Sequence, residues 1–196
     1  MDTVKGALFW PVVTLFQYVR FTLGCVICLF PVLYARPREF FDLFVTLADL
    51  PLGRYVFSGV VSFFAPYSSS VGPFVKDLSS QGCVVQIQDW PWMRNPFSSV
   101  HAIALANLGE QVGGILMVCL LQRRRDLRAI PTRVDTVYAK KARGLIEGRS
   151  DAISLDFAGE EKEVQVVGKM FDSAGQLVAT TTVYWTVRRI IDKKSQ

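Results

Sequence analysis

One long run without proline and almost without charge, residues 98–121, constrains the fold of this chain more than any other feature. As an α-helix, which rises about 1.5 Å per residue, the run would extend for about 35 Å. From Ala102 onward its only polar residues are Asn107, Glu110 and Gln111. A helix that is apolar on nearly every face must be covered on nearly every side, either by protein or by lipid.

Strand-like segments on both sides of the run favour coverage by protein. Residues 83–88 alternate in polarity as a half-buried strand does, and the two prolines of residues 89–96 end that strand. Four strand-like segments follow the run, the last two joined by a hairpin turn at 173–176: residues 132–138, 142–157 with an interruption near Ser150, 163–172 and 177–188.

We therefore expect an α+β domain in which one curved antiparallel sheet wraps around a long central helix, which is the hotdog fold. A second transmembrane helix at residues 98–121 is the alternative for the run. The polar residues inside the run and the strand signals on both sides of it disfavour that alternative.

The amino-terminal segment, residues 7–34, is directed to a membrane in our interpretation. Arg20 is the only charged residue between Lys5 and Arg36, and the segment is long enough to span a bilayer. An arginine at a bilayer centre costs about 2.5 kcal/mol or more. Three alternatives stay open: a spanning helix with Arg20 paired, a helix lying in the interface, or a helix docked on partner proteins. No small-residue cleavage site follows, so a removed signal peptide is not expected.

Two further helices are predicted before the sheet. Residues 37–51 are amphipathic, and their apolar side could rest on a membrane or pack against the neighbouring domain. Residues 52–66 form another apolar helix, and residues 67–73 are a plausible hinge. The resulting division is a hydrophobic membrane-directed helix (1–36), an amphipathic helical connector (37–73), a hotdog domain (74–190) and a tail (191–196).

The charge and cysteine patterns limit the classes of partner and cofactor that we expect. The net charge is +5, with basic clusters at 123–125, 140–143 and 188–194, but no aromatic interleaving or nucleic-acid motif accompanies them. A solvated surface, or attraction to anionic lipid headgroups and to acidic cofactors such as coenzyme A, accounts for them at least as well. Cys25 and Cys28 form a C-x-x-C without a second pair, so we expect no zinc site, no other metal and no resident cofactor.

Glu110 is the residue that most needs an explanation. An unpaired ionised carboxylate is costly in an apolar environment, so Glu110 must have hydrogen-bond partners or face a cavity if its helix is buried. A structural carboxyl group paired across a subunit interface is the alternative to a catalytic one.

The stretch around Glu110 resembles a known family. Asn95, His101 and Glu110 follow the pattern Asn-x5-His-x8-Glu, which is similar to that of hotdog thioesterases related to the bacterial PaaI type. A closer resemblance is to an uncharacterised branch of that superfamily in fungi and other eukaryotes. It covers residues 52–185 and rests on three motifs: APYS at 65–68, RNPFSSVHAIALANLGE at 94–110 and KKARG at 140–144.

The resemblance implies a role for each matched residue. Glu110 would be the nucleophile or the base that activates water against a thioester carbonyl, and the N–H of Ala102 would polarise that carbonyl. Asn95 would orient the thioester or the water. Asn107 and Gly114 would join Ala102 in contacting the substrate. His101 would be either a motif residue or simply a helix-start residue bonding to backbone. In this superfamily the groups meet across a dimer interface, so a second hotdog domain is expected, from the same or a different chain.

The chain departs from the family pattern in three places. Ala102 and Ile103 replace the two glycines that follow the histidine, and Gly114 stands where some thioesterases place a hydroxyl.

The sequence leads to two hypotheses about function. The first is a membrane-associated acyl-CoA thioesterase-like protein that hydrolyses or binds fatty acyl thioesters. The second is a non-catalytic scaffold subunit of a mitochondrial inner-membrane complex, such as the respiratory chain or ATP synthase. Location at the mitochondrial inner membrane is favoured in both.

Overall fold

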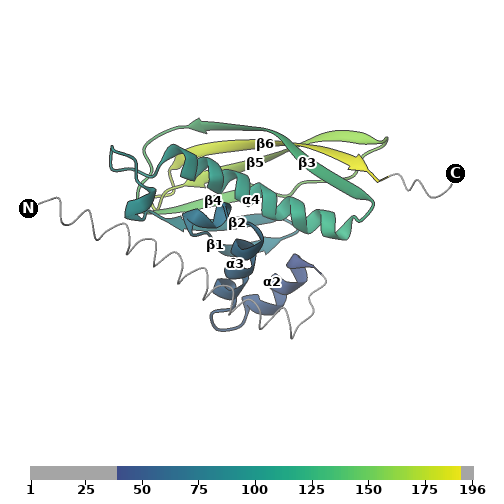
Figure 1. Cartoon of the computed structure of the whole chain (residues 1–196), viewed down its shortest axis with the longest axis horizontal. Helices are drawn as coiled ribbons and strands as arrows, with labels where there is room; N and C mark the ends of the chain where they lie inside the picture. Colours follow the sequence, from purple (N-terminus) through teal and green to yellow (C-terminus); the bar gives the residue numbers. More distant parts are fainter. Residues whose placement is uncertain (1–38, 191–196) are drawn as a thin grey trace, which may run out of the picture.

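The long apolar run forms a single helix, α4 (Ala102–Arg123), which lies against one six-stranded antiparallel sheet (Figure 1). The computed structural model describes residues 39–190. The sheet has the order β1-β2-β4-β5-β6-β3. Its strands are β1 (Phe74–Ser79), β2 (Gly82–Gln88), β3 (Leu127–Tyr138), β4 (Leu145–Asp151), β5 (Glu161–Phe171) and β6 (Leu177–Arg189). A curved antiparallel sheet around a long central helix is the hotdog fold, as the sequence predicts.

Glycines allow α4 to lie very close to the sheet. A Cβ atom on Gly168 of β5 would lie 2.7 Å from the carbonyl oxygen of Gly109, and a Cβ on Gly113 would lie 2.8 Å from Cγ1 of Val166. Both distances are shorter than van der Waals contact allows, so larger residues would force the helix away from the sheet. Gly148 of β4 meets Val112 in the same way, at 2.7 Å.

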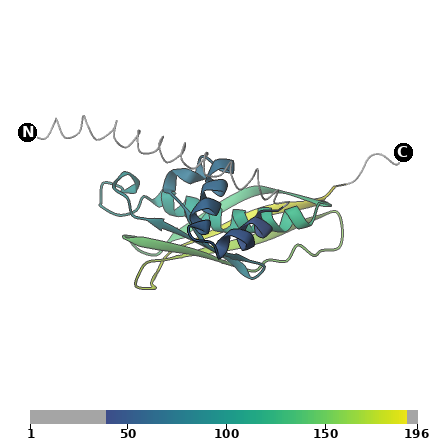
Figure 2. The same ribbon diagram turned by 90° about the horizontal axis from the view of Figure 1, so that it is seen from below.

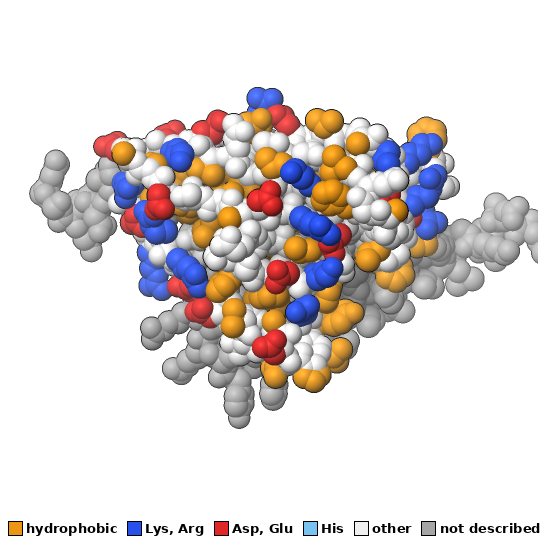
Figure 3. All heavy atoms as spheres, turned by 180° about the vertical axis from the view of Figure 1, so that it is seen from behind, with side chains coloured by type: hydrophobic (Ala, Val, Ile, Leu, Met, Phe, Trp, Pro, Cys, Tyr) orange, Lys and Arg blue, Asp and Glu red, His pale blue; other side chains and the backbone are white. Residues whose placement is uncertain are grey.

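The two faces of the sheet differ as the alternation of its strands predicts. In β5 and β6 every second side chain is buried against α4, including Val166, Met170 and Val183. Seen from behind, the molecule presents Lys, Arg, Asp and Glu side chains interspersed with apolar ones (Figure 3). One face of the sheet therefore packs against the core, and the other face is exposed to solvent.

A layer of short helices packs beside α4 at the β1 end of the sheet. It consists of α2 (Phe40–Ala48), α3 (Gly53–Phe64) and the 3₁₀ turn η1 (Ser68–Val71), which lie below α4 in Figure 1 and are seen from another side in Figure 2. Phe44 and Phe57 meet edge to face, with ring centroids 5.1 Å apart. The N–H of Phe40 donates to Oε1 of Gln122 on α4 at 2.7 Å. The apolar side of residues 37–51 thus packs against the domain, which was one of the two alternatives that the sequence left open.

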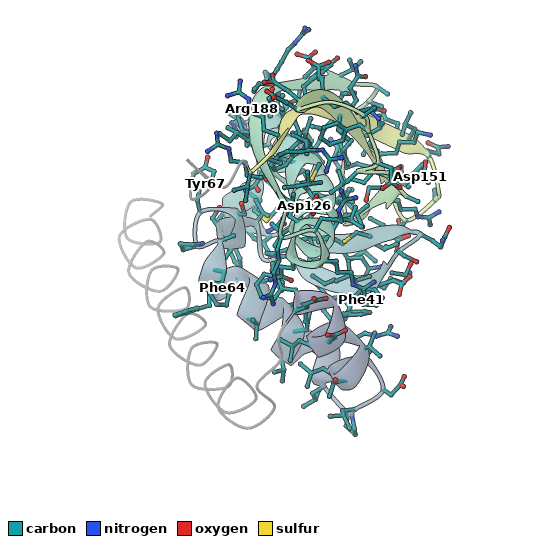
Figure 4. The ribbon with its side chains drawn as sticks, turned by 90° about the vertical axis from the view of Figure 1, so that its right-hand side faces the viewer. Phe41, Phe64, Tyr67, Asp126, Asp151 and Arg188 are labelled. Carbon is teal, nitrogen blue, oxygen red and sulfur yellow. The ribbon has the colours of Figure 1, made fainter. Side chains whose placement is uncertain are left out.

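Viewed along α4, the sheet curves over the helix, and α2 and α3 lie below it (Figure 4). Within residues 39–190, α4 is the one helix that is long and apolar enough to cross a membrane. Protein covers most of it, as expected for the central helix of a domain. The hydrophobic segment 7–34, with Cys25 and Cys28, lies outside the described residues.

Element boundaries differ from the sequence prediction for identifiable reasons. Strand β1 was not predicted, because a register shift between Val75 and Asp77 interrupts its alternation. Strand β3 begins five residues before the predicted start at Thr132 and passes through Pro131, which an edge strand tolerates. Strand β4 ends at Asp151, and the following residues pack Leu155 on the sheet without joining it.

Candidate functional site

The start of α4 is capped by its own histidine. His101 has an extended backbone, and its Nδ1 accepts a hydrogen bond from the N–H of Ile103 at 3.1 Å. The carbonyl oxygen of His101 accepts from the N–H groups of Ala104 and Leu105. The N–H of Ala102 is left without an acceptor among the described residues. This is the donor that the family resemblance predicts for a thioester carbonyl, and a helix amino terminus favours a developing negative charge.

The amide of Asn95 is engaged in its own loop. Its Oδ1 accepts from the N–H of Phe97 at 2.9 Å and from the N–H of Ser99 at 3.3 Å, while its Nδ2 donates to the hydroxyl of Ser99 at 3.0 Å. Such bonds stabilise a turn. Asn95 therefore shapes the loop before α4, and no bond from it to Glu110 is found among the described residues. The predicted role in orienting the substrate stays a prediction.

Glu110 lies on the open face of α4. Helical periodicity places it in line with Ile103, Asn107 and Gly114, at steps of three and four residues. Ile103 is 58% exposed, and the other three are half-buried, whereas Leu108 on the sheet side is fully buried. We call these four residues the open stripe. The structure thus brings together Glu110, Asn107 and Gly114 of the predicted site residues.

The Glu110 carboxylate is partly buried and has no protein partner among residues 39–190. It forms no hydrogen bond or ion pair with any described residue, and burial raises the pKa of its carboxyl group above the usual value for glutamic acid. A glutamate of raised pKa is a stronger base than an exposed one, and carboxyl groups in apolar sites often have catalytic roles. The burial of Glu110 is thus compatible with general-base chemistry.

Gly114 leaves room for this carboxylate. A Cβ atom at residue 114 would lie 3.1 Å from Oε1 of Glu110, closer than nearly all real contacts of this kind. From the sequence, only the absence of a hydroxyl at residue 114 is apparent. The structure adds that the missing side chain allows the observed position of the acid.

Edge strand β3 lies beside α4 and contributes residues that the sequence analysis did not single out. The Tyr138 hydroxyl donates to the carbonyl oxygen of Ala102 at 3.0 Å. The hydroxyls of Thr136 and Thr181 lie 2.9 Å apart, and Thr181 packs against Gly109, next to Glu110. Hydrophobic periodicity could not reveal these residues, because their position depends on how the sheet curves around α4.

The two ends of the predicted site are far apart within one chain. Ala102 and Glu110 are separated by eight residues of one helix, or about 12 Å along its axis. A reacting carbonyl would have to lie within about 3 Å of both groups. One subunit therefore cannot supply both groups to a single site.

Residues 39–190 include side chains of the types that bind metals, and thiols. Residues 39–190 contain no group of three or more His, Cys, Asp or Glu side chains placed to hold a metal ion. Cys83 and Cys119 are buried free thiols, and burial raises the pKa of Cys119 to about 12. A thiol with so high a pKa is a poor nucleophile at neutral pH.

Comparison with solved structures finds the same fold in several bacterial proteins. A structural-genomics protein is 24% identical, with a TM-score of 0.63, over 71% of this chain and 92% of its own. A Pseudomonas aeruginosa protein described as a probable thioesterase is 18% identical, with a TM-score of 0.61, over 72% of this chain and 97% of its own. A mutant thioesterase from Staphylococcus aureus is 12% identical, with a TM-score of 0.54, over 63% of this chain and 98% of its own. Likeness at such identities establishes the fold and not the activity.

Sequence comparison assigns the family. No curated protein matches the chain. One family model, described as "Domain of unknown function (DUF4442)", matches residues 53–187, nearly the range over which the motif resemblance extends. Because this match covers well over half of the chain, from the start of α3 almost to the end of β6, the protein belongs to the DUF4442 family.

Proposed function

We propose that this protein is a membrane-associated acyl thioesterase that hydrolyses fatty acyl thioesters such as acyl-CoA, with Glu110 as its catalytic acid–base residue. The observation that carries the proposal is the uncompensated carboxylate of Glu110 on the open stripe of α4. A carboxylate without partners in an otherwise apolar helix is costly, and such costs are usually retained for function. Proteins of the same fold named as thioesterases support the reaction class.

The chemistry needs two subunits. Glu110 of one subunit takes a proton from water, and the resulting hydroxide attacks the thioester carbonyl carbon. The N–H of Ala102 from the second subunit stabilises the oxyanion. Collapse of the tetrahedral intermediate breaks the C–S bond, and the proton on Glu110 passes to the departing thiolate. Direct attack by Glu110, followed by hydrolysis of the anhydride, is the variant of this scheme in which it acts as nucleophile.

Strand β3 is the surface that we assign to the second hotdog domain. It is an edge strand of twelve residues whose outer side has no strand partner among the described residues. Val134, Val137 and Ile130 on it are 48–70% exposed. Long edges with apolar side chains tend to pair with another strand. Pairing of two copies along β3 would bring the open stripe of each α4 toward the partner.

Association with the membrane is supported by α3 and by the segment that precedes the described residues. Leu52, Tyr55, Phe64 and Tyr67 on or beside α3 are 63–76% exposed. Figure 4 shows Phe64 and Tyr67 on the same flank of the molecule. Exposed aromatic and aliphatic side chains of this kind suit the interface of a bilayer. Together with residues 7–34 they favour a membrane location, for which the mitochondrial inner membrane is our preferred site.

Hydrolysis of a panel of acyl-CoAs by the full chain and by Glu110→Gln tests the proposal. We expect the variant to lose at least about a hundredfold in kcat, as general bases contribute about 10²–10⁴. Glu160→Gln, at an exposed position before β5, is the matched control and should retain activity. An equally active Glu110→Gln variant would refute the catalytic assignment.

The second candidate function is that of a non-catalytic scaffold subunit in a mitochondrial inner-membrane complex. It is favoured by Asn95 and His101, two of the predicted catalytic residues, because both side chains are hydrogen-bonded to local backbone groups. Extraction in mild detergent separates the two candidates. A stoichiometric large complex without thioesterase activity would support the scaffold, whereas a discrete active dimer would exclude it.

A further inference from the structure

Two loops beside the start of α4 are joined into one rigid platform. Residues 89–101 form the first loop and residues 139–144 the second. The N–H of Asp89 donates to the carbonyl of Gly144 at 3.0 Å, and the N–H of Gly144 donates to Oδ2 of Asp89 at 3.2 Å. The N–H of Val100 donates to the carbonyl of Ala142 at 2.9 Å. Backbone bonds at both ends thus fix the loops relative to each other.

A side chain also joins the two loops. Nε of Arg143 donates to the carbonyl oxygen of Ser98 at 2.9 Å. Ser98 has a φ of 55°, in the left-handed region that residues other than glycine seldom adopt. The bond from Arg143 helps to hold this conformation. It also places the guanidinium group at the surface of the platform, where its remaining N–H groups have no acceptor among residues 39–190.

The platform carries more positive charge than its own acids neutralise. Arg94 is paired with Asp89 at 2.9 Å, and Lys140 with Asp172 at 2.7 Å. Lys141 and Arg143 are both exposed, and neither forms an ion pair with an acidic residue in the described part of the chain. Two neighbouring cations without acidic partners, one of them held in place by its bond to Ser98, are suited to binding an anion.

An aromatic ring accompanies these two cations. Phe97 is 70% exposed at the tip of the first loop, and Nζ of Lys141 lies 5.6 Å from the centroid of its ring. An exposed ring beside two cations can stack a nucleobase while the cations hold phosphate groups. The platform is also bonded to the start of α4: the N–H of His101, the residue before the helix, donates to the carbonyl of Met93 at 2.7 Å. The unpaired N–H of Ala102 follows at the next residue.

We infer that this platform binds the 3′-phosphoadenosine diphosphate end of coenzyme A, with its phosphates on Lys141 and Arg143 and its adenine on Phe97. The inference rests on the proposed function and deepens it, because it names the part of the substrate that the protein holds away from the reacting carbonyl. The acyl thioester would then extend from the platform toward the start of α4. Substrates without the nucleotide, such as acyl-pantetheine, would lose this contact and keep the chemical step.

Titration of the full chain with coenzyme A and with adenosine 3′,5′-bisphosphate tests the inference. Lys141→Glu should weaken the binding of both by about tenfold or more, because it replaces an attraction to phosphate with a repulsion. Lys169→Glu, which makes the same change on an exposed residue of β5, is the matched control and should bind normally. Arg143→Gln should weaken binding as well, and its circular dichroism and melting temperature report whether the domain has kept its fold.

Kinetics separate this inference from the proposed function. With acyl-CoA, Lys141→Glu should raise KM and leave kcat nearly unchanged, and with acyl-pantetheine it should have no effect. Equal coenzyme A affinity in the wild type and in Lys141→Glu would overturn the inference while leaving the thioesterase proposal intact. Weaker binding to anionic vesicles, with coenzyme A affinity unchanged, would overturn it too and assign the platform to lipid. Lys141-dependent binding without hydrolysis of any thioester would uphold the platform and refute the enzyme.

Discussion

At the scale of single residues, the proposed activity depends on a carboxylate that is partly buried without a protein partner. Glu110 has no partner among the described residues, and Gly114 provides the space in which its carboxylate lies. The need for such an acid to have a partner or a cavity could be argued from the sequence. The positions of Tyr138 and Thr136 beside α4 could not, because both belong to a strand that is distant in sequence.

The first prediction concerns stability and pH. The pKa of Glu110 is higher in the folded state than in the unfolded state. Between these two pKa values the folded protein binds more protons than the unfolded protein, so ionisation of Glu110 lowers the stability as pH rises. Glu110→Gln removes the free-energy cost of this ionised, partly buried carboxylate. The variant should therefore melt a few degrees above the wild type at pH 8, and the difference should shrink toward pH 4. Melting curves across this range check the prediction, and a variant less stable at pH 8 would contradict it.

The second prediction compares two neighbouring glycines. Gly114→Ala should gain about 0.5–1 kcal/mol of helix stability but reduce hydrolysis, because its Cβ crowds the Glu110 carboxylate. Gly113→Ala is the control, and its Cβ would meet the buried Val166 at 2.8 Å. Overpacking of this kind costs about 1–3 kcal/mol. Chemical denaturation and initial hydrolysis rates measured on both variants check this prediction. Equal changes in stability and in hydrolysis rate for the two variants would contradict it.

At the scale of helices and strands, the close approach of α4 to the sheet and the unpaired edge at β3 define the site. The central helix and strands β2, β5 and β6 could be predicted from their periodicity, because one side of each faces the core. Strand β1 could not, since its bulge breaks the alternation, and the extent of β3 was hidden by Pro131. The order of the strands, which makes β3 an edge, is a property of the whole sheet.

The third prediction places a charge on that edge. Val134 lies opposite the buried Val183, so its side chain points to the same inner face, where it is 48% exposed. Val134→Arg should shift the protein from dimer to monomer and lower hydrolysis with it, because inward charges on an edge strand oppose pairing. Light scattering after size exclusion measures the mass. Arg128→Lys, which changes no charge on the same strand, should leave the dimer intact.

At the scale of the whole molecule, a hotdog domain is joined to a layer of helices beside α4, at the β1 end of the sheet. One continuous cluster of buried side chains runs from Leu43 of α2 to Val178 and Ala179 of β6. The sequence predicted these helices but left open whether they pack on the domain or lie on a membrane. Their buried sides pack on the domain, and the exposed residues of α3 remain free for another surface.

The fourth prediction concerns that surface. The full chain should float with lipid vesicles, and a chain without residues 1–36 should float more weakly. Tyr67→Glu in the shortened chain should abolish the residual binding, because Tyr67 is 76% exposed beside α3. Leu177→Glu, at an exposed position on β6, serves as the control. A shortened chain that binds no vesicles would show that α3 is not a lipid-binding surface.

The central claim is that Glu110 of one subunit and the Ala102 N–H of the other form each active site. Mixing two inactive variants tests it most directly. Glu110→Gln removes the base, and Ala102→Pro removes the N–H at the first helical position, which proline tolerates because His101 before it is extended.

Random mixing of the two variants gives dimers of which half are mixed, and each mixed dimer has one intact site. We therefore predict recovery of about a quarter of the wild-type hydrolysis rate. Hydrolysis that stays absent after subunit exchange has been verified would contradict the account, because it would mean that the two groups do not meet across a dimer.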